Sequence, residues 1–329
     1  MNERVDLEGV LSIIGNTPLV KLAKLFENTN FNIFAKLELL NPGGSMKDRA
    51  AISMIKNALL NGEIRPGTTI IESSSGNMAI GLALACAYYG LKLICVVDSK
   101  ASEQNLSILK AYGAKIDLVS NPDPISGDFL QARIDRVKFL RTTIEDSYWP
   151  CQYTNENNPI AHYNTTMQEI SSVLDKIDFL FCAVSTCGTL KGCIDYIHDN
   201  KLGTKVFAVD AVGSVIFGGK KGKRLLPGHG ASIEPFFSQN GIGNLIEDCI
   251  RVTDLDCVIG CRRLVKSEAI LAGGSAGGVL MAVERVKHQI PPGSNCVVIL
   301  PDRGERYLDT VYSDNWVKEK FGDLSILQI

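Results

Sequence analysis

The chain has 329 residues, of which 45% are hydrophobic, and its formal net charge at pH 7 is −2. Acidic and basic residues are mixed along the sequence, and no basic stretch is interleaved with aromatic residues, which argues against a nucleic-acid partner. The length is enough for two domains of roughly 100–200 residues each, and no apolar run approaches the ~20 residues that a membrane span requires.

Short apolar segments rich in β-branched residues alternate with longer helical patterns. In chain order, the predicted strands are IFAKLEL (33–39), TTIIES (68–73), LKLICVVD (91–98), KIDLVS (115–120), DFLFCAVS (178–185), KVFAVDA (205–211) and NCVVILPD (295–302). The predicted helices cover residues 48–60, 78–89, 102–112, 129–141, 160–174 and 275–290. Nearly continuous apolar strands separated by helices indicate parallel sheets covered on both faces, so the predicted fold class is α/β.

Residues 70–98 have the pattern of one complete β-α-β unit. Its helix is apolar on nearly all sides, which predicts burial between layers, and Gly90 ends it with a residue that tolerates a left-handed conformation. A loop at 119–128 is rich in proline, glycine and aspartate. A longer loop at 213–232 contains six glycines and a basic cluster. The longer loop is either a solvated connection or a lid that faces the substrate.

The ten cysteines are scattered singly, mostly within apolar runs, and none forms a Cys-x-x-Cys pair. Buried free thiols in a reducing compartment explain this pattern better than disulfides or a zinc site, so we expect no metal site. The N-terminal sequence MNERVDLEGVL is acidic and lacks the apolar core of a signal peptide. These features together predict a cytoplasmic protein without membrane association.

Lys47 occupies an unusual place in NPGGSMKDRA (41–50), behind two glycines and a serine, where a loop is expected to become a helix. A cation is unfavourable at a helix N-terminus, so helix stability does not explain this lysine. Three further loops combine glycine with hydroxyl or amide side chains next to predicted helices: SSSGN (73–77), STCGT (185–189) and AGGSAGG (272–278). Each would place backbone N–H groups at a helix N-terminus and could bind phosphate or carboxylate, although Ser, Thr and Asn are also ordinary helix caps.

The usual nucleotide-binding motifs are absent, because neither G-x-x-x-x-G-K-[ST] nor an opening G-x-G-x-x-G occurs. A lysine, an anion-binding loop and a separate Ser/Asn loop suit a cofactor with an aldehyde and a phosphate arm, beside a substrate carboxylate. Pyridoxal 5′-phosphate has this shape, and lysine is the residue that its Schiff base requires.

These motifs resemble the cysteine synthase family, the β-substituting group of fold-type-II (tryptophan synthase β-like) pyridoxal-phosphate enzymes. The following stretches fall in the family's order and spacing, from about residue 10 to 312: GNTPLVKL (15–22), NPGGSMKDR (41–49), SSGN (74–77), STCGT (185–189), GGSAG (273–277) and GERYLDT (304–310).

The resemblance implies a role for each matched residue. Lys47 would form the internal aldimine and later move the substrate α-proton. Asn77 would bind the cofactor's ring hydroxyl, and Ser275 would face the pyridine nitrogen. The cofactor phosphate would be cradled by Ser185, Thr186, Cys187, Gly188 and Thr189. The substrate carboxylate would be bound by Ser74, Ser75 and Gly76.

The resemblance also implies an architecture. A larger cofactor-binding domain would combine residues 1–45 with 155–329, and a smaller mobile domain would comprise residues 46–154. The cofactor would lie between the two domains, each with an open, parallel-type sheet covered by helices. A homodimer is expected by resemblance alone.

Some residues depart from plain cysteine synthase. Ser185 replaces a glycine at the start of the phosphate loop, Met78 replaces a threonine, Tyr153 stands where phenylalanine is common, and Arg133 is an added cation. The departures look most like the subgroup that joins the amine of L-glutamate to O-phospho-L-serine through an aminoacrylate, on a 2,3-diaminopropionate route to siderophores and peptide antibiotics.

A doubly anionic leaving group and a dicarboxylate nucleophile call for extra cations and hydroxyls. Arg133, Tyr153 and Ser185 match subgroup positions that could supply them to the substrates. Arg133 could instead be a solvated helix arginine like Arg136.

Two other functions stay open. A cysteine synthase would use sulfide with O-phosphoserine or O-acetylserine, whereas a catalytically silent paralogue would act as a partner protein. The intact Lys47, Asn77 and Ser275 argue against the silent paralogue. His162 and His229 have no paired carboxylate at a diagnostic spacing and are expected to be local hydrogen-bonding groups, although His162 could matter through the HYNTT stretch.

Overall fold

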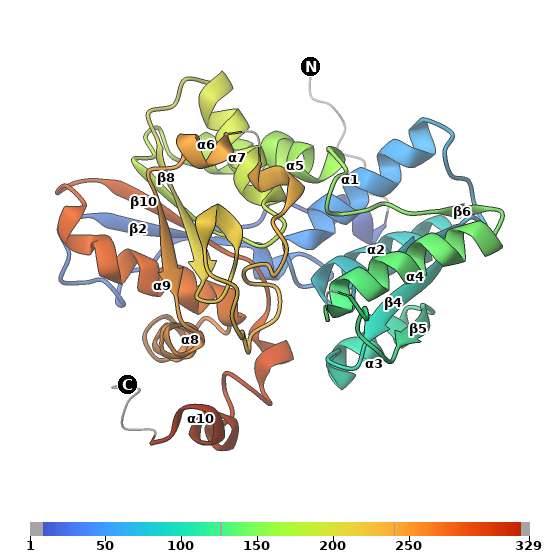
Figure 1. Ribbon diagram of the computed structural model, residues 1–329. Helices are drawn as coiled ribbons and strands as arrows, with labels where there is room; N and C mark the ends of the chain where they lie inside the picture. Colours follow the sequence, from blue (N-terminus) through green and yellow to red (C-terminus); the bar gives the residue numbers. More distant parts are fainter. Residues whose placement is uncertain (1–8, 126, 240, 324–329) are drawn as a thin grey trace. The chain divides into compact units, whose positions relative to one another are not determined.

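The computed structural model describes residues 9–125, 127–239 and 241–323, which form two compact units (Figure 1). Unit 1 contains residues 9–14 and 41–160, and unit 2 contains residues 15–40 and 161–323. The expected division, with 46–154 as a mobile domain, stays a prediction, and the compact units differ from it in placing residues 9–14, 41–45 and 155–160 in unit 1. Residues 1–8, part of the stretch expected not to be a signal peptide, lie outside the described residues.

Unit 1 is built on four parallel strands in the order β5-β4-β3-β6. These strands are β3 (Thr69–Glu72), β4 (Lys92–Asp98), β5 (Lys115–Val119) and β6 (Ser147–Tyr148). The helices are α1 (Lys47–Leu60), α2 (Asn77–Tyr89), α3 (Glu103–Ala111), α4 (Phe129–Thr143) and α5 (Asn157–Ala161), of which only the last residue belongs to unit 2. Ile70, Leu93 and Val97 share a core with residues of α1, α2 and α3. Ile71 and Val96 pack on the other face against α4, so helices cover both faces of the sheet.

Unit 2 contains a second sheet, of six strands in the order β1-β2-β10-β7-β8-β9. Its strands are β1 (Leu19–Lys21), β2 (Asn32–Leu37), β7 (Phe179–Ala183), β8 (Lys205–Ala211), β9 (Asp248–Val252) and β10 (Asn295–Leu300). Only β1 pairs antiparallel in this sheet. Its helices are α6 (Gln168–Val173), α7 (Gly188–Asp199), α8 (Asp254–Glu268), α9 (Gly274–Val286) and α10 (Asp314–Phe321). Phe181 and Val209 share a buried core with residues of α8 and α9, and the predicted α/β fold with parallel-type sheets is confirmed.

Shorter helical segments complete the described structure. The 3₁₀ helices are η1 (Val10–Ile13), η2 (Glu38–Leu40), η4 (Ile216–Gly218), η5 (Phe236–Ser238), η6 (Ile242–Leu245), η7 (Lys287–Gln289) and η8 (Gly304–Tyr307). The segment η3 (His162–Met167) is a π-helix. It lies between α5 and α6, inside the single helix that the sequence predicts at 160–174.

The β-α-β unit predicted at residues 70–98 is present as β3-α2-β4, and every residue from Met78 to Cys86 is buried. Gly90 ends α2 with a φ of 65°, as predicted. Gly81 lies where α2 meets α1, because an added Cβ there would lie 3.0 Å from Ala51 Cβ and 3.2 Å from Asp48 Cα. The absence of a side chain at Gly81 therefore allows the N-terminal part of α1 to pack directly on α2.

All seven predicted strands are present within one or two residues of their expected bounds. Three further strands, β1, β6 and β9, were not predicted. The first two have only three and two residues, and β9 has the sequence DCIRV, whose charges interrupt the apolar pattern. Tertiary pairing at or near a sheet edge determines these strands more than local sequence does.

The ten cysteines are free thiols, as predicted. Eight are buried, and Cys151 and Cys249 have intermediate exposure. Burial raises the pKa of the Cys86 thiol to about 12 and that of the Cys296 thiol to about 12. Because the thiolate is the reactive form, these side chains behave as small apolar groups at neutral pH.

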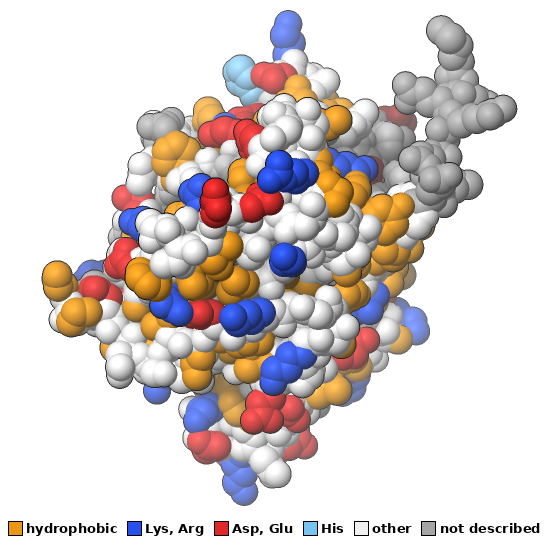
Figure 2. All heavy atoms as spheres, turned by 90° about the vertical axis from the view of Figure 1, so that its right-hand side faces the viewer, with side chains coloured by type: hydrophobic (Ala, Val, Ile, Leu, Met, Phe, Trp, Pro, Cys, Tyr) orange, Lys and Arg blue, Asp and Glu red, His pale blue; other side chains and the backbone are white. Residues whose placement is uncertain are grey.

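Across the described ranges, no helix combines the length and the apolar character needed to span a membrane. On the face of the molecule in Figure 2, basic and acidic side chains are interspersed with hydrophobic ones. This mixture agrees with the small net charge of the sequence.

Candidate active site

Lys47 is the first residue of α1 and is partly buried, as the sequence predicts. The loop before it is held by Asp48, whose buried carboxylate accepts a hydrogen bond of 2.5 Å from the Gly43 N–H group. A Cβ on Gly43 would lie 2.4 Å from Asp48 Oδ1, so only glycine fits there. The Ser45 hydroxyl accepts from the Lys47 backbone N–H at 3.2 Å. These contacts explain the spacing of NPGGSMKD, because they set the backbone from which the lysine side chain projects.

Asn77 begins α2, directly after β3 and the loop of Ser73 to Gly76. Gly76 has φ −114° and ψ −147°, and its N–H group donates to Ser74 Oγ at 3.4 Å. Ser74 is 8% exposed, and Ser75 and Gly76 are partly buried. The loop therefore presents hydroxyls and backbone N–H groups at the N-terminus of α2, the arrangement expected for a carboxylate site.

Glu72, the last residue of β3, holds this loop and was not singled out by sequence. Its carboxylate is fully buried and accepts from Trp149 Nε1 at 3.1 Å, from the Ser73 N–H at 2.8 Å and from the Gln152 N–H at 3.3 Å. Burial raises the pKa of Glu72, and these donors oppose that rise. The sequence signal that could have identified Glu72 is its position as a charged residue at the end of the buried strand β3.

Tyr153 and Arg133 lie together at the carboxyl ends of β3 and β4. The Tyr153 hydroxyl donates to the Ser73 carbonyl at 3.3 Å. Arg133 Nε lies 3.3 Å from Asp98 Oδ2, at the end of β4, and the two side chains are 15% and 9% exposed. Burial and the charge of Glu72 raise the pKa of Tyr153, while the Arg133 charge lowers it. Unit 1 thus places a neutral hydroxyl and a guanidinium beside the SSSGN loop.

The STCGT loop connects β7 to α7 in unit 2. Cys187 precedes α7 with a φ of 64°, which is unusual for a residue with a side chain. Thr186 and Thr189 are buried, and the Gly188 N–H group lies 3.5 Å from Thr186 Oγ1. The N–H groups in the first turn of a helix lack intrahelical partners, so this loop has the donors that an anion requires.

The Ser185 hydroxyl in the same loop donates to the Gly230 carbonyl at 3.1 Å. Gly230 in turn donates from its N–H group to the Val184 carbonyl at 2.7 Å. The last part of the 213–232 loop is therefore tied to the STCGT loop, whereas Lys220, Lys221 and Lys223 in its middle are exposed. The 213–232 loop is therefore exposed to solvent at residues 220–223 and contacts the STCGT loop at Gly230.

Ser275 is the second residue of α9 and is partly buried. The turn before it is held by Asp302, whose carbonyl accepts from the Gly273 N–H at 2.9 Å and whose carboxylate accepts from Tyr307 Oη at 2.8 Å. A Cβ on Gly273 would lie 2.0 Å from Asp302 Oδ1, so this turn requires glycine. The PDRGERY stretch thus positions the start of α9, a role that the sequence did not reveal.

His229 is fully buried in the 213–232 loop and acts as a local hydrogen-bonding group, as expected. Its Nε2 lies 3.0 Å from the Val209 carbonyl and its Nδ1 lies 3.7 Å from Cys257 Sγ. Since a carbonyl only accepts, Nε2 carries the proton. Burial lowers the pKa of His229 from 6.5 to about 4, against the opposing effect of this hydrogen bond.

This lowered pKa predicts loss of stability in mild acid. As the pH falls from about 6.5 to about 4, the unfolded chain binds a proton on residue 229 while the folded chain does not, so the free energy of unfolding decreases. The contribution approaches about 1.4 kcal/mol per pH unit. Urea unfolding at pH 7, 6 and 5 should show this slope and a shallower one in His229→Gln, whose amide still donates to Val209. Equal slopes in the two proteins would contradict the prediction.

The structure thus assembles two groups of expected site residues, each within one unit. Unit 1 holds Lys47, Ser74–Asn77, Arg133 and Tyr153, and unit 2 holds Ser185–Thr189 and Ser275. Met78, one of the departures from the family pattern, is 2% exposed in the core of unit 1.

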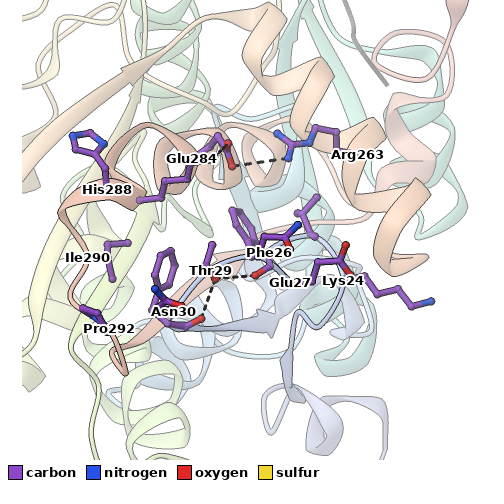
Figure 3. A pocket seen from close by; sticks show the side chains of 14 residues that line it. Lys24, Phe26, Glu27, Thr29, Asn30, Arg263, Glu284, His288, Ile290 and Pro292 are labelled. Carbon is purple, nitrogen blue, oxygen red and sulfur yellow. Dashed lines mark hydrogen bonds and ion pairs between the residues drawn. The ribbon is translucent and has the colours of Figure 1, made fainter.

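A separate pocket of about 600 Å³ lies on unit 2, between residues 24–31 and the helices α8 and α9 (Figure 3). Glu284 in its lining pairs with Lys287 at 2.6 Å and with Arg263 at 3.9 Å. None of the expected site residues lines this pocket. Three of its charged side chains, Arg263, Glu284 and Lys287, are paired with one another, and the pocket is not a candidate for the active site.

Residues 10–302 of the chain match the sequence family of pyridoxal-phosphate dependent enzymes. The chain is 46% identical to N-(2-amino-2-carboxyethyl)-L-glutamate synthase of Ralstonia nicotianae over 311 aligned residues. The alignment covers 94% of this chain and 91% of that protein.

Two solved structures are also similar over nearly the whole chain. A hydrogen sulfide-producing enzyme from Fusobacterium nucleatum is 34% identical, with a TM-score of 0.84 over 92% of this chain and 99% of that one. An O-acetylserine dependent cystathionine β-synthase from Helicobacter pylori is 32% identical, with a TM-score of 0.85 over 94% of this chain and 100% of that one.

Proposed function

The chain belongs to the pyridoxal-phosphate dependent enzymes, and from that premise we propose that it makes N-(2-amino-2-carboxyethyl)-L-glutamate and phosphate from O-phospho-L-serine and L-glutamate. It is an enzyme of the β-replacement kind, as the resemblance to the cysteine synthase family implied. In the proposed reaction the Cβ–O bond of phosphoserine breaks and a bond from Cβ to the glutamate nitrogen forms. The synthase from Ralstonia nicotianae supports this product.

The described residues fit pyridoxal 5′-phosphate. The N-terminus of α7, with a left-handed Cys187 and the buried hydroxyls of Thr186 and Thr189, suits the phosphate arm. A lysine at the start of α1 suits the aldehyde. Ser275 offers a neutral hydroxyl for the pyridine nitrogen, and Asn77 offers an amide for the ring hydroxyl. The donor set therefore matches the chemistry of the cofactor, part by part.

When bound, this cofactor withdraws electrons from the α-carbon of an attached amino acid and so allows a leaving group on Cβ to depart. We assign the proton transfer at the α-carbon to the Lys47 amine. A serine at position 275 cannot hold a proton on the pyridine nitrogen as a carboxylate would, which favours elimination at Cβ over long-lived carbanion chemistry. Ser74, Ser75 and Gly76 would bind the substrate carboxylate at the start of α2.

The observation that carries the choice of substrates is the Arg133 guanidinium at the carboxyl end of β4, 3.3 Å from Asp98 and beside Tyr153. Ligands of open α/β sheets bind at the carboxyl ends of strands. A planar guanidinium there suits a second carboxylate or a phosphate, groups that sulfide lacks. We propose that Arg133 recognises the side-chain carboxylate of glutamate or the phosphate of phosphoserine. Tyr153 and Ser185 would contribute hydrogen bonds to the substrates by turning their hydroxyls away from the Ser73 and Gly230 carbonyls.

A second candidate is a cysteine synthase that uses O-phosphoserine or O-acetylserine with sulfide. The structural likeness to the hydrogen sulfide-producing enzyme and to the O-acetylserine dependent cystathionine β-synthase favours it. These relatives share the fold, so the nucleophile must be decided by the chemistry of the site.

A competition experiment tests the proposal. The purified enzyme, loaded with cofactor, is incubated with O-phosphoserine and equal concentrations of glutamate, sulfide, aspartate and glutamine, and the products are identified by mass. We expect the glutamate adduct to dominate over the sulfide and glutamine products, because sulfide and glutamine lack the side-chain carboxylate that Arg133 is proposed to bind. A sulfur-containing product without a glutamate adduct would select the cysteine synthase instead.

We further propose a homodimer in the cytoplasm that supplies a 2,3-diaminopropionate precursor for a siderophore or peptide antibiotic. These assignments follow from the resemblance to the subgroup. Sedimentation of the purified enzyme tests the first of them.

A further inference from the structure

We propose that His162 is a positioning residue that orients the Thr189 hydroxyl toward the cofactor phosphate, through a directed chain of hydrogen bonds from Thr166 to His162 to Thr189. The inference rests on the proposed binding of the phosphate by the STCGT loop. It does not depend on which nucleophile the enzyme uses.

The three side chains form a continuous buried contact within unit 2. His162 and Thr166 are 0% exposed and Thr189 is 5% exposed. His162 Nδ1 lies 2.9 Å from Thr166 Oγ1, and His162 Nε2 lies 3.1 Å from Thr189 Oγ1. Thr189 is the second residue of α7 and the last of the STCGT loop. Both ring nitrogens are thus engaged, and one of them reaches the loop directly.

The backbone around His162 is specialised. Residues His162–Met167 form a π-helix that packs against α7. Single turns of π-helix inside α-helices occur frequently at functional sites. Thr166 is four residues after His162, and residues at this spacing lie on the same side of a helix. The other edge of the imidazole faces α7, where it contacts Thr189.

The direction of the hydrogen bonds follows from proton counting. A neutral imidazole donates from one nitrogen and accepts at the other, and each threonine hydroxyl has one hydrogen. A phosphate dianion only accepts hydrogen bonds, so the Thr189 hydroxyl must donate its single hydrogen to the phosphate. Its oxygen can then only accept from His162 Nε2–H. Nδ1 is left as the acceptor of the Thr166 hydroxyl, and all three hydrogens point along one path toward the anion.

The opposite direction would not serve this purpose. With the proton on Nδ1, Nε2 would accept the single hydrogen of Thr189, and the lone pairs of that hydroxyl would face the phosphate. The lone pairs of the hydroxyl and the negative charge of the phosphate would then repel each other at the N-terminus of α7. A histidine that only pins η3 to α7 would tolerate either tautomer, which makes the tautomer diagnostic.

The first test reads the tautomer in the wild-type enzyme loaded with pyridoxal 5′-phosphate. The chain has four histidines, so the ¹⁵N resonances of labelled imidazoles are few, and His162→Gln identifies those of residue 162. We expect a neutral ring protonated on Nε2. Protonation on Nδ1, or on both nitrogens, would overturn the proposal.

The second test measures the dissociation constant of pyridoxal 5′-phosphate in a double-mutant cycle. Thr189→Val and His162→Phe are each expected to weaken binding roughly tenfold, since each removes or misorients a hydrogen bond to a charged group. The double variant should bind no more weakly than Thr189→Val alone, because His162 acts through that hydroxyl. His162→Gln, whose amide can still donate to Thr189, should retain more affinity than His162→Phe.

The outcomes separate the two levels of the proposal. If Thr189→Val leaves the dissociation constant unchanged, the proposed binding of the phosphate by Thr189 is wrong, and so is the proposed role of His162. If Thr189→Val weakens binding but His162→Phe does not, or if the two effects add, only the positioning role of His162 is wrong. Should His162→Phe fail to fold, the tautomer in the wild-type enzyme still decides.

Discussion

Replacement of Lys47 by alanine is expected to lower kcat for β-replacement by roughly 10³–10⁴-fold, the largest loss that we expect from a single substitution. The proposed roles of the amine, holding the cofactor aldehyde and moving the substrate α-proton, have no substitute on the same helix turn. Its neighbours Asp48 and Arg49 are buried, and Asp48 is occupied with the Gly43 N–H group.

Reduction with borohydride gives a readout that does not depend on catalysis. A stable pyridoxyl label is expected on the peptide that contains Lys47 in the wild-type enzyme, with none in Lys47→Ala. Lys56 is the matched control, because it lies on the same helix and is exposed. Lys56→Ala should keep both the label on Lys47 and the activity.

Two results would contradict this assignment. One is a label on another lysine in the wild-type enzyme, and the other is a Lys47→Ala variant that retains substantial turnover. Either would mean that the loop of NPGG and the start of α1 serve the fold alone.

Much of the candidate site could be predicted because its parts are local. In NPGGSMKD the glycine and the aspartate that meet are five residues apart, and STCGT carries its hydroxyls and its helix start in one stretch. Strand ends followed by glycine and hydroxyl residues therefore indicate both the element and its chemistry. The bounds of α1, α2 and α4 agree with their patterns within two residues for the same reason.

What escaped prediction depends on contacts between distant parts of the chain. Glu72 meets Trp149 across 77 residues. Ser185 meets Gly230 across 45 residues. No local pattern tells which buried polar groups will pair, although a charged residue within an apolar run signals that some partner exists. The π-helix was hidden for another reason, since hydrophobic periodicity does not separate six π-helical residues from the α-helix around them.

Arg133→Ala is expected to raise KM for L-glutamate by roughly 10- to 100-fold, since a hydrogen bond to a charged group contributes about 1.5–3 kcal/mol. The arginine lies at the carboxyl end of β4 beside Tyr153, whose hydroxyl reaches the Ser73 carbonyl. Sulfide has no carboxylate, so turnover with sulfide should be retained. The measured quantity is the ratio of kcat/KM for glutamate to that for sulfide within one preparation, in which a general loss of folded enzyme cancels.

Two variants on the same helix sharpen this experiment. Arg136 donates two hydrogen bonds to Asp117, at 2.8 and 2.9 Å, and Arg136→Ala should leave the ratio unchanged. Arg133→Lys keeps the charge near Asp98 but loses the planar pair of donors, and should fall between wild type and Arg133→Ala. If Arg133→Ala lowers both rates equally, the arginine does not recognise glutamate, and it either binds the phosphate of phosphoserine or only balances the buried Asp98 charge. If it lowers neither, Arg133 has no role in substrate recognition, and glutamate recognition must be sought at Tyr153 and Ser185.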